Sequence, residues 1–112
     1  MTNTPNIIRK PIPKRSKKEI NDLVIDLMAK MTLKEKIGQM LCLAFHGTEY
    51  NDQLKTLIEE YNIGTIIHFA RNIVDLKQIY KLNNDIHKHA KFPTFIGLDH
   101  EGGMVRRVMN EI

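Results

Sequence analysis

The sequence predicts an α/β protein built on a parallel β-sheet. Three apolar runs rich in β-branched residues begin near residues 40, 65 and 94, and a helical pattern separates each run from the next. Strands that alternate with helices are typical of βαβ units, and near-continuous apolar runs indicate strands covered on both faces. Three such strands leave two open edges. We therefore expect the opening third of a larger fold, since an eight-stranded parallel barrel takes about 250 residues.

The first 18 residues form a basic leader, which we expect to be disordered. Six of the 17 Lys and Arg residues lie in it and no acid does, whereas residues 19–112 carry 11 basic and 13 acidic side chains. The leader therefore accounts for the net charge of +4. A basic segment can contact nucleic acid or anionic lipid, but this one has three prolines and no aromatic residue. We expect no nucleic-acid partner, with a functional leader as the alternative.

Four helices are predicted from capping signals and apolar periodicity. Ser16 with Glu19, and Thr32 with Glu35, have the spacing of a capping box, in which two side chains satisfy free amides at a helix start. Apolar residues then recur at helical spacing. The predicted helices cover residues 17–30, residues 33–38, an Asn51 or Asp52 cap to residue 61, and an Asp75 cap to about residue 90.

The strands between these helices are predicted at residues 40–45, 65–69 and 94–98. Cys42 lies in the first strand, where we expect an inert core thiol. A lone Cys cannot close an intramolecular bridge, which excludes a disulfide scaffold. The uncharged stretches are far shorter than the ~20 apolar residues of a membrane span. Because no secretory segment is recognisable either, we expect a cytoplasmic protein.

Candidate functional residues follow the predicted strands, at the sheet edge where sites form in parallel α/β folds. Three clusters qualify: His46-Gly47, His68 to Asn72, and Asp99 to Gly103. The last is the densest, because two carboxylates and an imidazole precede two glycines. Three roles stay open for Asp99. It could bind a ligand, form a glycosidase-type carboxylate pair with Glu101, or cap a helix and pair with Arg106 or Arg107.

The other polar residues indicate neither a metal site nor a phosphate loop. The donors of Arg71-Asn72 suit a hydroxyl or carboxylate of a ligand, and the alternative is an ion pair between Arg71 and Glu101. His87 and His89 lie two residues apart on a helix, so they cannot share a metal. We expect His68 to be a satisfied interior histidine. No metal and no cofactor are therefore expected.

Three blocks of the sequence stand out together, at residues 31–40, 64–73 and 96–105. In this order and spacing they resemble glycoside hydrolase family 3, and most of all its β-N-acetylhexosaminidase branch. The resemblance extends over about residues 20–112. The Asp-x-Glu-Gly-Gly form at residues 99–103 favours N-acetylglucosaminidases, with the β-glucosidase branch of the same family as the alternative.

The resemblance implies the first three β/α units of a TIM-type (β/α)₈ barrel, with residues 19–112 as an N-terminal fragment of that domain. It implies retaining hydrolysis of terminal β-linked N-acetylglucosamine from cell-wall fragments or glycoconjugates, without a metal or organic cofactor. Asp99 matches the family's aspartate that hydrogen-bonds the bound sugar, and Arg71 matches an arginine near the same pocket. The pocket-supporting turn corresponds to His100, Glu101, Gly102 and Gly103.

The sequence departs from the family pattern at two positions, and it lacks several of the family's segments. His100 stands where many members carry Gln, and Met104 where many carry Arg. The family's Lys-His, Gly-His-Gly and Asp-x-His segments and its nucleophilic aspartate have no counterpart in the 112 residues. We therefore expect the chain alone to contain no catalytic residue and to be inactive. The alternative is a truncated, non-catalytic product that acts as a weak carbohydrate-binding or interaction module. Unpaired parallel edges lead us to expect self-association of the isolated chain.

Overall fold

The computed structural model describes residues 13–108, and residues 1–12 and 109–112 lie outside it. The chain divides after Lys30 into two units. Most of the predicted basic leader therefore falls outside the described residues. The last two leader residues, Lys17 and Lys18, already belong to the first helix.

The first unit is helix α1, Lys17–Lys30. Its predicted capping box is confirmed: the Ser16 amide donates to the Glu19 carboxylate over 2.7 Å, and the Glu19 amide donates to the Ser16 hydroxyl over 3.2 Å. Lys18 and Asp22, one turn apart, form an ion pair. These contacts lie within one segment, so the local sequence alone determines where α1 begins.

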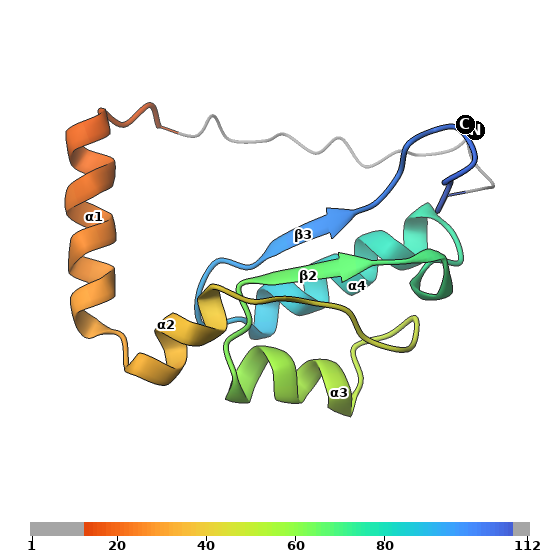
Figure 1. The fold of residues 1–112 in the computed structure, drawn as a ribbon, viewed down its shortest axis with the longest axis horizontal. Helices are drawn as coiled ribbons and strands as arrows, with labels where there is room; N and C mark the ends of the chain where they lie inside the picture. Colours follow the sequence, from red (N-terminus) through yellow and green to blue (C-terminus); the bar gives the residue numbers. More distant parts are fainter. Residues whose placement is uncertain (1–12, 109–112) are drawn as a thin grey trace. The chain divides into compact units, whose positions relative to one another are not determined.

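The second unit is built on a three-stranded parallel sheet in the order β1-β2-β3. The strands are β1 Cys42–Leu43, β2 Thr65–His68 and β3 Phe95–Leu98. Figure 1 shows β2 and β3 side by side. Thr65 pairs with Cys42 on one side and with Phe95 on the other. The predicted βαβ arrangement is therefore confirmed, while nothing in these three strands closes a barrel.

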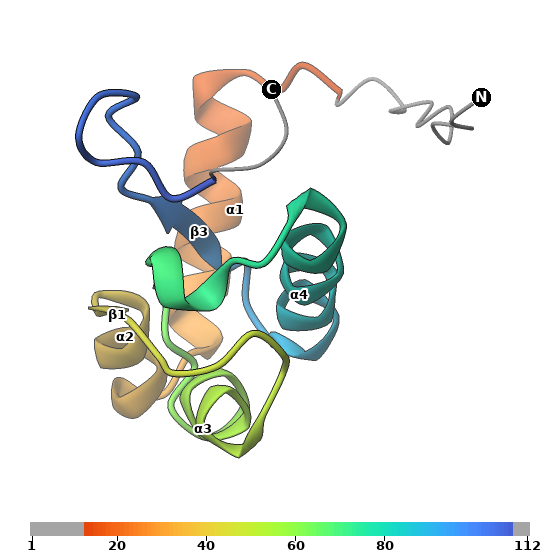
Figure 2. The same cartoon turned by 90° about the vertical axis from the view of Figure 1, so that its right-hand side faces the viewer.

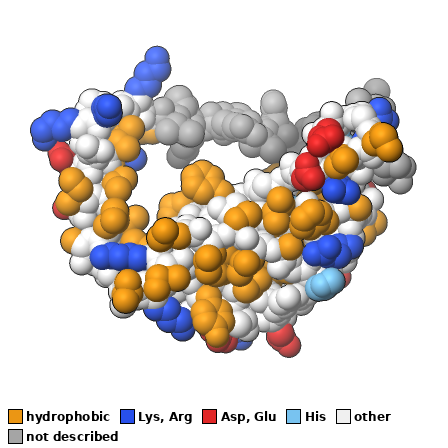
Figure 3. Space-filling view, in the orientation of Figure 1, with side chains coloured by type: hydrophobic (Ala, Val, Ile, Leu, Met, Phe, Trp, Pro, Cys, Tyr) orange, Lys and Arg blue, Asp and Glu red, His pale blue; other side chains and the backbone are white. Residues whose placement is uncertain are grey.

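One face of this sheet packs on helices, and among the described residues of the second unit no helix or strand covers the other. Because side chains alternate along a strand, Ile66 and His68 point to the helices and are buried, whereas Thr65 and Phe95 point away. The Phe95 side chain is 77% exposed. Figure 3, in the orientation of Figure 1, shows hydrophobic side chains gathered over the strands.

Two details of the predicted strands are wrong. β1 spans two residues rather than six, and both are exposed, so the Cys42 thiol is not part of the core. β3 is not buried on both faces either, since Phe95 and Leu98 are exposed. Burial on both faces requires a second layer. The described residues of this unit supply a helical layer on one face only.

Helix α2, Leu33–Gln39, begins at the second predicted capping box. The Thr32 amide donates to the Glu35 carboxylate over 2.8 Å, and the Glu35 amide donates to the Thr32 hydroxyl over 3.2 Å. The helix lies directly against the segment that precedes β2. A Cβ at Gly38 would overlap the carbonyl oxygen of Tyr61, so this contact requires glycine.

The two crossover connections supply the helical layer. Helix α3, Asp52–Lys55, is capped by Asn51 and continues as a π-helix, η1, over Thr56–Glu60. Helix α4, Leu76–His89, begins at Asp75, whose carboxylate accepts from the Gln78 amide over 2.7 Å. Both predicted caps are confirmed.

Helices α3 and α4 enclose the hydrophobic core against the sheet (Figure 2). Each crossover and β2 contribute buried side chains to it. The core consists of Phe45, Leu54, Ile58, Ile63, Ile66, Leu82 and Ile86. Within residues 13–108, no helix is long and apolar enough to cross a membrane.

Candidate functional site

The three predicted clusters lie at the carboxyl edge of the sheet, in the loops that follow the strands, except that His68 is the last residue of β2. Phe69, directly after β2, brings two of them together. Its ring centroid lies 5.0 Å from the guanidinium carbon of Arg71 and 5.6 Å from that of Arg107. Both distances are within the range of cation–π attraction. The ring therefore gathers one arginine from the second cluster and one from the loop after β3.

Asp99 joins this group through Arg107. The Asp99 carboxylate lies 3.5 Å from the Arg107 Nη2, and the Arg107 Nε donates to the Asp99 carbonyl oxygen over 3.1 Å. The ion pair with Arg107, one of the three roles open for Asp99, is therefore present. The Asp99 side chain is 48% exposed, so its carboxylate also remains accessible to a ligand. The two roles are compatible.

The loop after β3 folds back so that Arg107 reaches Asp99. The Glu101 amide donates to the Val105 carbonyl over 3.0 Å, and the Arg107 amide donates to His100 Nδ1 over 3.2 Å. Gly102 has φ +80°, a conformation that other residues rarely adopt. His100, Glu101 and Gly102 therefore shape the turn. A Cβ at Gly103 would meet nothing within 4 Å, so glycine is not sterically required there.

The second cluster differs from its prediction in two respects. Among the described residues Arg71 forms no ion pair with Glu101, and its Nε donates to the Phe45 carbonyl over 3.1 Å. Asn72, in the short 3₁₀ helix η2 (Ala70–Asn72), is fully buried. Its amide donates to Phe45 O and Gly47 O over 3.1 and 2.8 Å, so it cannot donate to a ligand. Of the predicted pair, only Arg71 faces solvent.

His68 lies beneath this edge, on the helix-covered face of β2. It is 2% exposed, its Nε2 lies 2.7 Å from Asn83 Oδ1, and the edge of its ring meets Phe45. Burial lowers the pKa of this imidazole, and the hydrogen bond to Asn83 opposes the shift. Its Nδ1 has no partner within the described residues. His68 is thus an interior histidine, as predicted, although only half satisfied.

The two histidines near the end of α4, His87 and His89, make separate backbone contacts. His87 Nε2 lies 3.1 Å from the Thr94 carbonyl, and His89 Nδ1 lies 2.7 Å from the Asp85 carbonyl. Within residues 13–108, no three His, Cys, Asp or Glu side chains gather closely enough to hold a metal ion.

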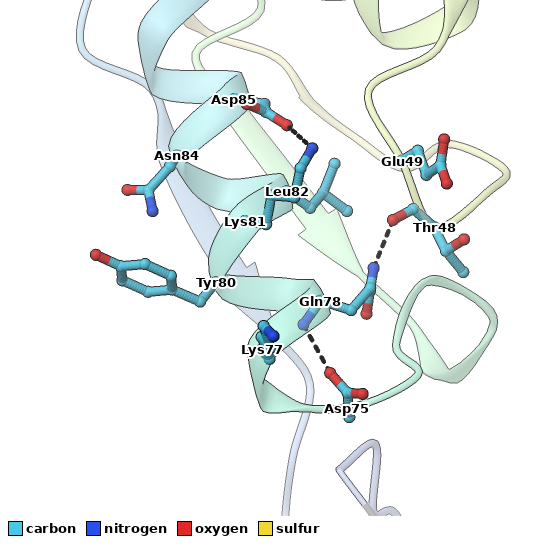
Figure 4. A pocket seen from close by; sticks show the side chains of 10 residues that line it. All are labelled: Thr48, Glu49, Asp75, Lys77, Gln78, Tyr80, Lys81, Leu82, Asn84 and Asp85. Carbon is cyan, nitrogen blue, oxygen red and sulfur yellow. Dashed lines mark hydrogen bonds and ion pairs between the residues drawn. The ribbon is translucent and has the colours of Figure 1, made fainter. Parts of the chain in front are cut away.

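A polar hollow lies elsewhere, between the loop after β1 and helix α4 (Figure 4). Lys81 and Asp85 form an ion pair in its wall, and Gln78 reaches across to the Thr48 carbonyl. Its lining includes none of Asp99, Arg71 and Arg107. The hollow and the carboxyl-edge cluster are therefore distinct.

Arg107 is the residue of this cluster that sequence reasoning missed as a functional candidate. The sequence indicates Arg107 only as an ion-pair partner of Asp99. One feature of the sequence points to Arg107: it lies eight residues after Asp99, and Gly102 and Gly103 between them allow the chain to turn back. Without the loop geometry, Arg106 was an equal candidate.

Comparison with known proteins associates this region with one family. The model of the "Glycosyl hydrolase family 3 N terminal domain" matches residues 32–111. A "Beta-hexosaminidase" of Photobacterium profundum is 42% identical over 65 residues, which are 58% of this chain and 20% of that protein. A "Beta-hexosaminidase" of Bordetella pertussis is 38% identical over 65 residues, 58% of this chain and 18% of that protein. The matched region thus spans about a fifth of each curated relative.

Solved structures agree with the sequence relatives. A glycoside hydrolase family 3 β-N-acetylglucosaminidase from a Paenibacillus species superimposes with a TM-score of 0.71 at 38% identity, over 73% of this chain and 16% of that one. A fungal multi-domain β-N-acetylglucosaminidase of the same family gives a TM-score of 0.63 at 41% identity, over 68% of this chain and 10% of that one.

Proposed function

The chain belongs to glycoside hydrolase family 3, and from this premise we propose that it holds the terminal sugar in a β-N-acetylhexosaminidase. The reaction is retaining hydrolysis of terminal β-linked N-acetylglucosamine. One observation carries the proposal: at the carboxyl edge of the sheet, Arg71 and Arg107 lie over the Phe69 ring and Asp99 pairs with Arg107. The matched family region contains all four residues.

The chemistry of this cluster suits a sugar. An ionised carboxylate only accepts hydrogen bonds, and its two oxygens can accept from two adjacent hydroxyls of a pyranose. Arg107 fixes the direction of the Asp99 carboxylate through the 3.5 Å ion pair and its bond to the Asp99 backbone. Arg71 offers its terminal nitrogens as further donors. We assign substrate binding to Asp99, Arg107 and Arg71, and pocket support to His100, Glu101, Gly102 and Gly103.

The fold fits the same proposal. We propose that β1, β2 and β3 are the first three strands of a (β/α)₈ barrel and that their uncovered face lines its interior. The parallel order, the helices on one face and the exposed Phe95 on the other support this arrangement. Sites of such barrels form at the carboxyl ends of the strands, where the cluster lies.

The bond-breaking step requires residues other than these. Retaining hydrolysis uses one carboxyl group as a nucleophile and another as an acid/base on either side of the glycosidic bond. Asp99 and Glu101 follow a single strand end, so they do not suit opposite sides of a sugar ring. We propose that the 112 residues bind the sugar without cleaving it.

NMR titration of the 112-residue chain with N-acetylglucosamine tests sugar binding. We expect shifts of the Asp99 amide and of the Arg71 and Arg107 Nε–H signals, with weaker binding for Asp99→Asn. Asp85→Asn is the matched control, because Asp85 is also paired with a basic residue but lies on α4. Glucose in place of N-acetylglucosamine distinguishes the β-glucosidase branch. Absence of shifts at millimolar sugar contradicts the binding proposal, and release of N-acetylglucosamine from a chromogenic substrate contradicts the proposed inactivity.

A further inference from the structure

The loop after β1 is held by an unusual set of side-chain donors. Four consecutive carbonyl oxygens, those of residues 45–48, each accept a hydrogen bond from a side-chain nitrogen. The donors belong to Arg71, Asn72, Asn51 and Gln78. Figure 4 shows Gln78 reaching Thr48. Three of the four donors come from the segment after β2, so this segment fixes the neighbouring loop.

Asn72 is the centre of this arrangement. It is fully buried, and each polar atom of its side chain is used: Oδ1 accepts from the Phe69 amide over 2.9 Å, while Nδ2 donates to Phe45 O and Gly47 O. Replacing it removes the side-chain partner of the Phe69 amide and of the Gly47 carbonyl and leaves Phe45 O with Arg71, and a polar group that loses its partner at a partly buried site is costly. Asn72 therefore ties the end of β1 to the end of β2.

Arg71 depends on the same acceptor. Its Nε donates to the Phe45 carbonyl, the oxygen that Asn72 also binds, and its guanidinium lies over the Phe69 ring. Asn72 thus holds both points that orient Arg71: the Phe45 oxygen, and Phe69 through its backbone amide. A ligand cannot touch Asn72, because no part of it is exposed.

From this shared geometry we infer that Asn72 is a positioning residue, which sets the direction in which Arg71 presents its donors to the sugar. The sugar-binding part of the inference rests on the proposed function, whereas the orientation of Arg71 does not. Without the Asn72 amide, the Phe45 carbonyl keeps Arg71 as a side-chain donor but is no longer held in one direction. The Arg71 guanidinium then keeps its charge but not its fixed orientation.

The first test reads Arg71 directly, without sugar. In the 112-residue chain the Arg71 Nε–H signal should be resolved and exchange slowly with solvent, because Phe45 O accepts from it. Asn72→Ala should shift this signal and speed its exchange. Gln78→Ala is the matched control, since it frees the Thr48 carbonyl of the same loop and the backbone carbonyl of Asn72 but leaves the Asn72 side chain and Phe45 O untouched. An Arg71 signal that is unchanged in Asn72→Ala, or changed equally in Gln78→Ala, overturns the inference.

A second substitution at Asn72 covers the case in which Asn72→Ala does not fold. If Asn72→Ala does not fold, Asn72→Ser takes its place, because the hydroxyl can still accept from Phe69 N while losing at least one of the two donors. The same two outcomes for the Arg71 signal then apply.

The second test measures N-acetylglucosamine affinity for the chain, for Asn72→Ala, for Arg71→Ala and for the double variant. We expect each single change to weaken binding about tenfold, as for the loss of one hydrogen bond to a charged group. The double variant should bind no more weakly than Arg71→Ala. If the fold-losses in affinity of the two single variants multiply in the double variant, Asn72 does not act through Arg71. If the unaltered chain binds no sugar, the proposed function fails, while the Arg71 signal still decides the inference about Asn72.

Discussion

Acidification should destabilise the second unit through His68. Burial lowers the pKa of this imidazole below its ordinary value of 6.5, so the folded chain keeps it neutral to a lower pH than the unfolded chain does. On unfolding the side chain returns to water and binds a proton whenever the pH is below 6.5. The unfolded state therefore binds more protons, and the free energy of unfolding falls as the pH drops below that value. The loss ends at the lowered pKa of the folded state.

The slope of the unfolding free energy against pH has an upper limit, and the structure identifies its cause. One proton taken up on unfolding changes the free energy of unfolding by at most about 1.4 kcal/mol for each pH unit. The described residues supply no charged group that shifts the pKa of His68, and a proton on Nδ1 would have no acceptor. Salt should therefore change the slope little, since nothing is there to screen.

The assay is urea unfolding followed by circular dichroism at several pH values between 5 and about 7.5, the range in which an unperturbed His titrates. For the unaltered chain we expect the free energy of unfolding to fall as the pH is lowered. In His68→Leu this slope should disappear, whatever the absolute stability of that variant. His87→Gln, which replaces an exposed histidine, serves as the control. An equal slope in the His68→Leu protein refutes the reasoning.

Three further changes test the packing. Gly38→Ala should destabilise the fold by about 1–3 kcal/mol, because its Cβ would overlap the Tyr61 carbonyl, whereas Gly103→Ala should stay within about 0.5 kcal/mol; equal melting temperatures contradict this contrast. Thr32→Ala removes the capping box of α2 and should cost about 1 kcal/mol in urea unfolding, and no loss would show that the cap does not matter. Phe95→Lys should reduce self-association in sedimentation velocity, because the Phe95 ring is 77% exposed on the uncovered face; an unchanged distribution contradicts that origin.

The helix starts were predictable because they depend on residues three positions apart. Ser16 with Glu19, Thr32 with Glu35 and the Asp75 cap all form their expected bonds. The parallel order followed from the alternation of strands and helices. Burial was less predictable, since it depends on what lies across the sheet. An apolar run such as that around Cys42 has the same pattern whether or not a second layer covers it.

The candidate site was predictable only in its location. Strand ends identified Asp99 and Arg71, but which partners these residues meet depends on loop conformation. The fold-back at Gly102 selects Arg107 over its neighbour, and that choice has no signal in composition or periodicity. The sequence allows Asn72 to be a ligand donor because an amide has the same donors whether it faces solvent or two carbonyls. Its burial becomes visible only when β1 and β2 lie together.

Isotope-filtered intermolecular nuclear Overhauser effects between N-acetylglucosamine and the labelled 112-residue chain test the central claim most directly. They identify the protein protons that the sugar touches. The account predicts transfer to the Phe69 ring and to the side chains of Arg71 and Arg107, with loss of transfer in Asp99→Asn. Transfer to Tyr80, which lines the polar hollow beside α4, without transfer to Phe69 would contradict it.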